Sequence, residues 1–273
     1  MPAPKTLYVS DLDGTLLRSD QRVSEHSCEI INRLVGKGMI FSYATARSFY
    51  TSSVVAAGLT ARLPLIVYNG AVIIDSADGS IMQRNFFDAK DAQYIFSALR
   101  EGGVSPIVYS FIDGIEKFSY NESTISPQLE QFVSTRSDRR KTPVSDDSLL
   151  MRGDIFYFTC IDTPEKLSPL NDQLRGRFNC LYQTDLYTGH QWLEIIPRAA
   201  TKANAIMQLK KLTGCDRIVS FGDGINDLPM FSISDECYAV GNACEELKAA
   251  ATGVIGSNDS DSVARWLEEN AIF

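Results

Sequence analysis

Histidine is scarce in this chain, which has only His26 and His190 among its 273 residues. This scarcity argues against a histidine-rich metal site and against a Ser–His–Asp triad. Positive charge is also in deficit, since 26 Lys and Arg stand against 34 Asp and Glu, for a net charge of -8 and a pI near 4.9. We therefore expect neither nucleic acid nor an anionic membrane as the main partner, and a site for an anion must supply its own local positive potential.

Paired cysteines and long apolar runs are missing as well. The six cysteines are scattered without a Cys-x-x-Cys pair, which predicts reduced, buried thiols in a cytoplasmic protein. Residues 1–6 lack the charged-then-apolar pattern of a secretory signal. The longest apolar stretch, 63–74, is interrupted at Asn69-Gly70 and is too short to span a bilayer.

What the chain does have is an ordinary globular composition, with 44% hydrophobic and 22% charged residues. In its first part, apolar runs predict strands at 7–10, 39–44 and 65–68, with helices at 24–37 and 49–57 between them. Unbroken apolar strands that alternate with helices are typical of a parallel sheet covered on both faces. The alternation returns near the C-terminus, with helices predicted at 203–212, 245–251 and 262–269 and strands at 217–221, 237–240 and 254–255.

The middle of the chain, residues 84–189, follows a different pattern. Strands such as 107–112 and 116–120 occur in hairpin settings, with Asp113-Gly114 as a favourable turn. The polar run 134–147 is interpreted as a loop or a frayed helix end. The middle therefore has the pattern of an α+β domain.

These patterns predict an α/β protein with two domains. We expect a Rossmann-like core with a parallel sheet, formed by residues 1–83 and 190–273, and an α+β domain inserted at 84–189. The strand expected at 192–196 is assigned to the core, directly before a helix that opens at Thr201-Lys202.

Two aspartates, Asp11 and Asp13, end the first predicted strand. Side chains alternate across a strand, so carboxylates two residues apart point the same way. Like charges held that close repel each other unless a cation or a phosphoryl group lies between them. Gly14 then allows a sharp turn, although an Asp-Gly pair after a strand is also a common turn signal without further meaning.

Three more polar clusters follow predicted strands or open predicted helices: Thr45-Ala46-Arg47, Thr201-Lys202 and Gly222–Asp227. Ligands of open α/β sheets bind at the carboxyl ends of the strands, so these clusters can converge on one site. Arg47 and Lys202 both lie where a helix begins, and a cation there opposes the helix dipole. A bound phosphate would relieve that conflict, although either side chain could instead extend into solvent.

Other phosphate and metal motifs do not fit. The chain has no Gly-x-x-x-x-Gly-Lys-Ser/Thr, and its segment Gly222–Asp227 has aspartate where a dinucleotide loop needs its last glycine. The segment 11–22 is not an EF-hand loop, because Arg22 occupies the position of the bidentate glutamate. Carboxylates around one magnesium-like site, together with Lys202, fit phosphoryl transfer better.

Four motifs in order resemble those of the haloacid dehalogenase superfamily of phosphatases. The late position of the inserted domain and the segment Tyr68-Asn69-Gly70-Ala71 resemble the Cof-type branch, which carries an α/β (type IIB) cap between its second and third motifs. The motifs that carry the resemblance are Asp11-x-Asp13-Gly14-Thr15, Thr45, Lys202 and Gly222-Asp223-Gly224-Ile225-Asn226-Asp227.

The resemblance implies a role for each motif residue. Asp11 would be the nucleophile that forms an aspartyl-phosphate, and Asp13 the general acid and then the general base. Mg²⁺ would be held by Asp11, by the backbone carbonyl of Asp13 and by Asp223, with Asp227 as an outer, water-mediated contact. The phosphoryl oxygens would be held by Thr45, Ala46, Lys202 and Asn226, and the remaining substrate contacts would be Arg47 and Asn69, although Asn69-Gly70 could equally be only a turn.

The function that these residues favour is a Mg²⁺-dependent phosphatase acting on a small phosphorylated metabolite, most simply a sugar phosphate. Two alternatives stay open: a hexose phosphomutase with a similar cap, and a non-catalytic protein that binds a phosphometabolite. The intact pair Asp11 and Asp13 argues against the silent binder. The sequence does not predict which metabolite is bound or the oligomeric state.

Overall fold

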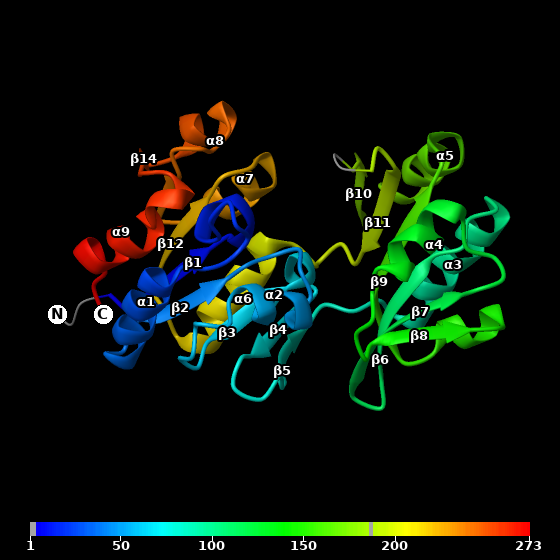
Figure 1. Cartoon of the computed structure of the whole chain (residues 1–273), viewed down its shortest axis with the longest axis horizontal. Helices are drawn as coiled ribbons and strands as arrows, with labels where there is room; N and C mark the ends of the chain where they lie inside the picture. Colours follow the sequence, from blue (N-terminus) through cyan, green and yellow to red (C-terminus); the bar gives the residue numbers. More distant parts are fainter. Residues whose placement is uncertain (1–3, 186–187) are drawn as a thin grey trace. The chain divides into compact units, whose positions relative to one another are not determined.

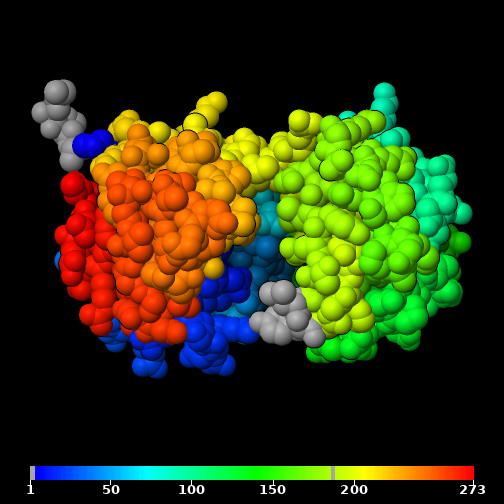
Figure 2. Space-filling model, turned by 90° about the horizontal axis from the view of Figure 1, so that it is seen from above, coloured from blue at the N-terminus to red at the C-terminus, as the bar shows by residue number. Residues whose placement is uncertain are grey.

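The computed structural model describes residues 4–185 and 188–273, so that residues 1–3 of the segment without a signal pattern lie outside the described part. The chain divides into two compact units, one formed by Met1–Arg84 with Thr201–Phe273 and the other by Asn85–Ala200 (Figure 1). The first unit thus joins the two ends of the chain. In the space-filling view its red and orange C-terminal segments share one surface with blue N-terminal segments (Figure 2).

The first unit is built on a five-stranded parallel sheet in the order β14-β13-β12-β1-β2. Strand β1, which lies between β12 and β2, is buried along its whole length, as its apolar sequence predicts. The strands are β1 (Thr6–Ser10), β2 (Ile40–Tyr43), β12 (Arg217–Gly222), β13 (Glu236–Ala239) and β14 (Gly253–Val254). A parallel bridge between Ala44 and Ile66 leads from β2 to a smaller antiparallel sheet of β3 (Pro64–Val67), β4 (Val72–Asp75) and β5 (Ile81–Arg84).

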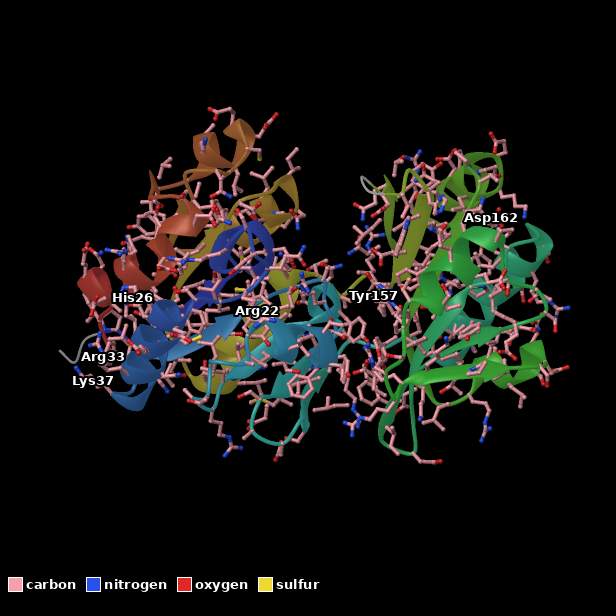
Figure 3. All side chains as sticks on the ribbon, in the orientation of Figure 1. Arg22, His26, Arg33, Lys37, Tyr157 and Asp162 are labelled. Carbon is pink, nitrogen blue, oxygen red and sulfur yellow. The ribbon has the colours of Figure 1, made fainter. Side chains whose placement is uncertain are left out.

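The helices of this unit follow the expected alternation, except that α7 between β12 and β13 was not predicted. Helix α1 (Glu25–Gly36) begins at Ser24, whose hydroxyl accepts a hydrogen bond from the backbone N–H of Ser27 at 3.0 Å. Its exposed side carries His26 and Arg33, with Lys37 directly after the helix, while Ile30, Ile31 and Leu34 are buried (Figure 3). The other helices are α2 (Phe49–Val55), α6 (Lys202–Thr213), α7 (Leu228–Phe231), α8 (Glu245–Ala250) and α9 (Ser262–Asn270).

The second unit is a six-stranded, mainly antiparallel sheet in the order β10-β11-β9-β6-β7-β8. The β6–β7 hairpin turns at Asp113 and Gly114, whose φ values of 51° and 76° suit the predicted turn. The strands are β6 (Ile107–Ile112), β7 (Ile115–Asn121), β8 (Lys141–Val144), β9 (Asp154–Asp162), β10 (Asn179–Thr184) and β11 (Gln191–Ile196), and the helices are α3 (Ala89–Glu101), α4 (Pro127–Ser134) and α5 (Pro164–Leu174).

The fold class predicted from sequence is confirmed: a parallel α/β core with an inserted antiparallel α+β sheet. Two details differ. Strand β11 was assigned to the core segment 190–273, but it pairs with β9 and β10 in the second unit. The boundary between the two units in the sequence therefore lies between Ala200 and Thr201. An apolar strand pattern does not reveal which sheet the strand joins.

The second difference lies in the polar run 134–147, expected as a loop or helix end, which contains strand β8. Pro143 lies inside β8, and proline is tolerated there because β8 is at the edge of its sheet.

Among the described residues, no helix is both long enough and apolar enough to cross a membrane.

Candidate active site

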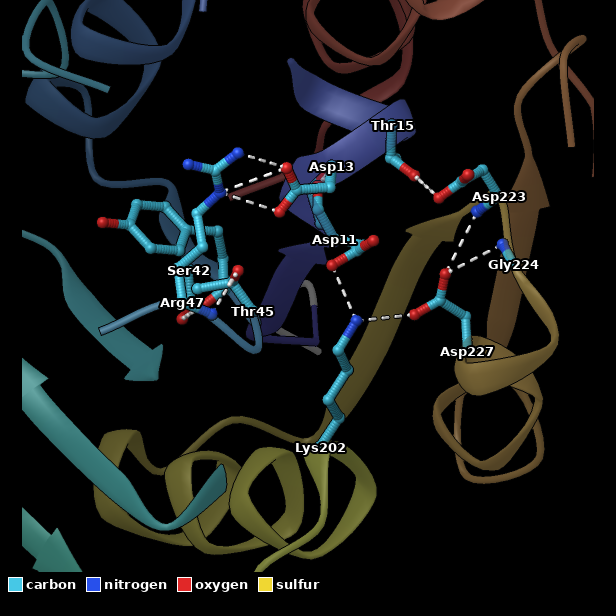
Figure 4. Close-up of polar contacts among 12 residues, drawn as sticks. Asp11, Asp13, Thr15, Ser42, Thr45, Arg47, Lys202, Asp223, Gly224 and Asp227 are labelled. Carbon is cyan, nitrogen blue, oxygen red and sulfur yellow. Dashed lines mark hydrogen bonds and ion pairs between the residues drawn. The ribbon is translucent and has the colours of Figure 1, made fainter. Parts of the chain in front are cut away.

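The site forms where strands β1 and β12 end at the same edge of the parallel sheet (Figure 4). Asp11 directly follows β1, and the chain then turns through Gly14 at a φ of 74°. A Cβ added to Gly14 would lie 2.4 Å from Oδ2 of Asp223, in the loop after β12. Glycine is therefore needed twice here, for its left-handed backbone and for the close approach of the two aspartate loops.

Lys202 links the third and fourth motifs to the first. Its Nζ donates to Oδ1 of Asp11 at 2.6 Å and to Oδ1 of Asp227 at 2.9 Å (Figure 4). Only 6% of Lys202 is exposed. The lysine opens α6, where the hydroxyl of Thr201 caps the helix by accepting from the backbone N–H of Asn204. The helix start thus holds the lysine inside the site rather than in solvent.

Burial and charge together set the ionisation of this cluster. Burial raises the pKa of Asp11 to about 7, with Lys202 opposing the rise and Asp227 and Asp223 adding to it. Burial alone would lower the pKa of Lys202, but the charges of Asp11 and Asp227 outweigh it and raise that pKa. Burial is also the main cause of the raised pKa of Asp223. The three carboxylates thus carry more negative charge than the single charge of Lys202 offsets.

The same crowding fits a divalent cation. Carboxylate oxygens of Asp11, Asp223 and Asp227 all lie within 4.8 Å of one another. Oxygen ligands from aspartates are those that Mg²⁺ prefers. Lys202 occupies Oδ1 of Asp11, and the hydroxyl of Thr15 donates to Oδ1 of Asp223 at 2.9 Å, so the second oxygen of each carboxylate is the one suited to a metal.

Asp227 has a different environment from the other two. It is fully buried, and its Oδ2 accepts from the backbone N–H groups of Asp223 at 3.1 Å and Gly224 at 3.2 Å, while its Oδ1 binds Lys202. Both oxygens are therefore engaged, Oδ2 in shaping the loop after β12 and Oδ1 in holding Lys202. This geometry suits an outer contact to a metal better than a direct bond.

Asp13 and Arg47 form a second charge pair at the site. Nε of Arg47 lies 3.1 Å from Oδ1 and 2.9 Å from Oδ2 of Asp13, and Nη2 lies 2.6 Å from Oδ1. The backbone N–H of Arg47 donates to the buried hydroxyl oxygen of Thr45 at 3.1 Å. The predicted phosphate loop after β2 is therefore tied to the Asp13 side chain through Arg47 (Figure 4).

Asn69 belongs to a strained turn that braces two of these loops. Tyr68, Asn69 and Gly70 all have positive φ, at 52°, 54° and 94°. The backbone N–H of Tyr68 donates to the carbonyl of Arg47 at 3.0 Å, and that of Asn69 to the carbonyl of Thr45 at 2.9 Å. A Cβ added to Gly70 would lie 2.3 Å from the carbonyl oxygen of Thr201. The turn thus supports the Thr45–Arg47 loop on one side and the start of α6 on the other.

The structure brings most of the predicted residues together, but not all to the same degree. Ala46 and Asn226 are exposed, and Oδ1 of Asn226 lies over Gly224, 2.4 Å from the position of an added Cβ. No hydrogen bond or ion pair joins the side chain of Asn226 to the Asp11 cluster in the described part of the chain. Thr15 was expected as part of a motif but not as the partner of Asp223, and the bracing role of Tyr68 and Gly70 was not predicted.

A family model of haloacid dehalogenase-like hydrolases matches residues 8–267. The chain belongs to this family. The match confirms the resemblance seen in the four motifs, and it covers both units.

Two relatives and one solved structure show which known proteins this hydrolase is similar to. An HMP-PP phosphatase of Serratia proteamaculans is 26% identical over 269 residues, which span 96% of this chain and 94% of the relative. A 5-amino-6-(5-phospho-D-ribitylamino)uracil phosphatase of Bacillus subtilis is 27% identical over 279 residues, spanning 95% and 96%. The crystal structure of a haloacid dehalogenase-like hydrolase from Bacteroides thetaiotaomicron has a TM-score of 0.78 at 24% identity, over 97% of this chain and 98% of that one, and shows the shared fold.

Proposed function

We propose that this hydrolase is a Mg²⁺-dependent phosphatase that acts on a small phosphorylated metabolite through an aspartyl-phosphate. One observation carries the proposal: the two aspartates of the first motif have separate cationic partners. Asp11 is buried against Lys202, and Asp13 is exposed and paired with Arg47. Two carboxylates in different environments can do different chemical work, one as nucleophile and one as proton carrier.

In the first half-reaction, a carboxylate oxygen of Asp11 attacks phosphorus, and the bond to the leaving oxygen breaks. Protonated Asp13 gives its proton to that oxygen, so that an alcohol departs and a carboxylate remains. In the second half-reaction this carboxylate takes a proton from water, whose oxygen attacks phosphorus and releases inorganic phosphate and Asp11. The net change is one phosphate ester and one water converted into one alcohol and one phosphate.

Other residues hold the transferring group. Lys202 presents a fixed positive charge beside Asp11, and the Thr45 hydroxyl and the Ala46 N–H are suited to the phosphoryl oxygens. Mg²⁺ would be held by Asp11, Asp223 and the backbone carbonyl of Asp13, where it would offset the negative charge that the phosphoryl group and the aspartates share. Asp227 would act through Lys202 and the loop that it shapes.

Two relatives named as phosphatases of small phosphorylated compounds support this substrate class. A sugar phosphate is the simplest member of the class. The competing activity is a phosphomutase, which must return the phosphoryl group to the product and so needs a bisphosphate activator.

A phosphate-release screen tests the proposal. Purified enzyme is offered a broad panel of phosphometabolites with Mg²⁺, with excess EDTA, and with a sugar bisphosphate, alongside Asp11→Asn as the matched inactive control. We expect phosphate release that needs Mg²⁺, needs no bisphosphate and is lost in the variant. Isomerised substrate without phosphate release would identify a mutase, and binding without turnover would identify a silent binder. Full activity in EDTA would contradict the proposed requirement for Mg²⁺.

A further inference from the structure

Arg47 is the least explained charge at the site. A cation at the start of a helix suggests a contact with the substrate phosphate, and the sequence predicts one. In the structure, however, the donors Nε and Nη2 of Arg47 face the carboxylate of Asp13 with three contacts between 2.6 and 3.1 Å. A two-point grip of this kind is the strongest and most directional way for an arginine to hold a carboxylate.

The arginine is itself held in place. Its backbone N–H binds the Thr45 hydroxyl at 3.1 Å, and its carbonyl accepts the N–H of Tyr68 at 3.0 Å. The Arg47 side chain is 24% exposed, whereas that of Asp13 is 51% exposed. An exposed aspartate has several rotamers open to it, and the arginine selects one of them.

We infer that Arg47 is the positioning residue of Asp13, and that it holds the carboxyl group for proton transfer rather than binding the phosphoryl group. This inference rests on the proposed phosphatase function. Oδ1 of Asp13 receives Nη2 and Nε, whereas Oδ2 receives Nε alone. Both oxygens are held in this structure, but Oδ2 has one contact, with Nε at 2.9 Å, against two for Oδ1. Oδ2 is therefore the oxygen that can leave the guanidinium and carry the proton to the leaving alkoxide, while Oδ1 keeps its contact with Nη2.

The leaving group provides a readout that a merely structural role would not affect. An alkyl phosphate releases a strongly basic alkoxide that must be protonated, whereas p-nitrophenyl phosphate releases a weakly basic phenolate that needs no proton. The value of kcat/KM reports only the steps through formation of the aspartyl-phosphate, so it isolates the proton given to the leaving group from the later attack of water.

We therefore compare kcat/KM of Arg47→Met with that of the wild type on an alkyl phosphate and on p-nitrophenyl phosphate. We expect a loss of about 10–100-fold on the alkyl phosphate, because a misplaced acid forfeits much of the 10²–10⁴-fold that general acid catalysis supplies. On p-nitrophenyl phosphate we expect less than about a threefold loss, and the inhibition constant of inorganic phosphate should stay within about twofold, since the phosphoryl contacts are intact. Arg47→Lys keeps the charge without the two-point grip and should fall between wild type and Arg47→Met.

A double-mutant cycle with Asp13→Asn completes the test. If Arg47 acts through Asp13, then Arg47→Met should cost nothing further on the alkyl phosphate once Asp13 is asparagine. The control is Arg62→Met, since Arg62 also pairs with an aspartate, with Nε 2.7 Å and Nη2 2.5 Å from Oδ2 of Asp75, and lies before β3, whereas the turn that braces Arg47 follows β3. It should leave the ratio of the two substrates unchanged.

Equal losses on both substrates, with weaker inhibition by inorganic phosphate, would show that Arg47 binds the phosphoryl group and would overturn the inference. Unchanged kinetics in Arg47→Met would also overturn it. A wild-type enzyme that releases phosphate from neither substrate would instead count against the proposed function.

Discussion

Both units of this hydrolase bury charged side chains, but they use them differently. In the first unit Lys202 lies between Asp11 and Asp227 at the end of the parallel sheet. In the second unit Arg140, 7% exposed, lies between Asp138 at 2.9 Å and Glu116 at 2.6 Å. The first cluster has more negative charge than its lysine offsets, whereas the guanidinium of Arg140 is shared by two carboxylates and lowers the pKa of Asp138.

The contrast separates a cluster built for chemistry from one built for stability. An excess of buried carboxylate has a cost in stability and is useful when a cation and a phosphoryl group are to be bound. A closed arginine–carboxylate network offers nothing to a ligand and secures the edge of a sheet. Mutations in the first unit should therefore change turnover, and those in the second should change the free energy of unfolding.

The largest effect is expected from Asp11→Asn. Without the nucleophile, phosphate release should fall by about 10⁴-fold or more, as when a covalent catalyst is removed elsewhere. The free energy of unfolding should change little, because Lys202 keeps Asp227 as a partner and one of the crowded carboxylates is gone. Turnover assays and urea unfolding measure the two quantities. Activity near that of the wild type would contradict the assignment of the nucleophile.

Arg140→Met should instead lower the free energy of unfolding and leave turnover unchanged. Removal of the arginine leaves Asp138 and Glu116 without the cation between them, and breaking a buried ion pair in this way costs about 3–5 kcal/mol. Urea unfolding of the full chain, followed by tryptophan fluorescence, measures this loss, since Trp192 belongs to the same unit. We expect kcat per folded molecule to stay at the wild-type value, and a loss below about 1 kcal/mol would show that the network contributes little.

Gly70→Ala tests a position where the first unit couples stability to activity. The new Cβ would lie 2.3 Å from the carbonyl oxygen of Thr201, at a φ of 94°. We expect a loss of about 2–3 kcal/mol in unfolding free energy, and a fall in kcat because the Thr45 loop and Lys202 shift together. Gly114→Ala is the matched control, since Gly114 has a φ of 76° and an added Cβ there meets nothing within 4 Å. Equal effects of the two variants on kcat would rule out the bracing role.

The smallest effect concerns Glu194 on β11, in the second unit. Burial raises its pKa to about 7 from the ordinary 4.5, while a hydrogen bond from Tyr157 opposes the rise. The folded state therefore keeps a proton that the unfolded chain releases above pH 4.5. The free energy of unfolding should therefore fall as the pH rises from about 4.5 to 7 and then level off.

Glu194→Gln should flatten that part of the pH profile, as measured by urea unfolding at several pH values. Glu130→Gln, on the exposed face of α4, serves as the control and should leave the profile unchanged. An identical slope in wild type and Glu194→Gln would mean that another group titrates.

Many elements of the first unit could be predicted from the sequence, because the sequence signals that define them are local. The strand ends, the N-cap at Ser24 and the order of the four motifs depend on residues close together in sequence. The assignment of β11 failed because Gln191–Ile196 lies close in sequence to the boundary between the units, and only its pairing with Asp154–Asp162 shows which sheet it joins. The edge strand Lys141–Val144 was not predicted because Pro143 lies within it, and proline is unfavourable in most strands.

The sequence by itself determined the kinds of element, the family, and the aspartates and lysine that converge at the sheet edge. Side-chain type and spacing are local properties, so the sequence alone contains them. Only the tertiary structure decided which charge meets which: Lys202 with Asp11 and Asp227, Arg47 with Asp13, and Thr15 with Asp223. Those pairings depend on residues far apart in the chain, and on the burial that makes an unpaired charge costly.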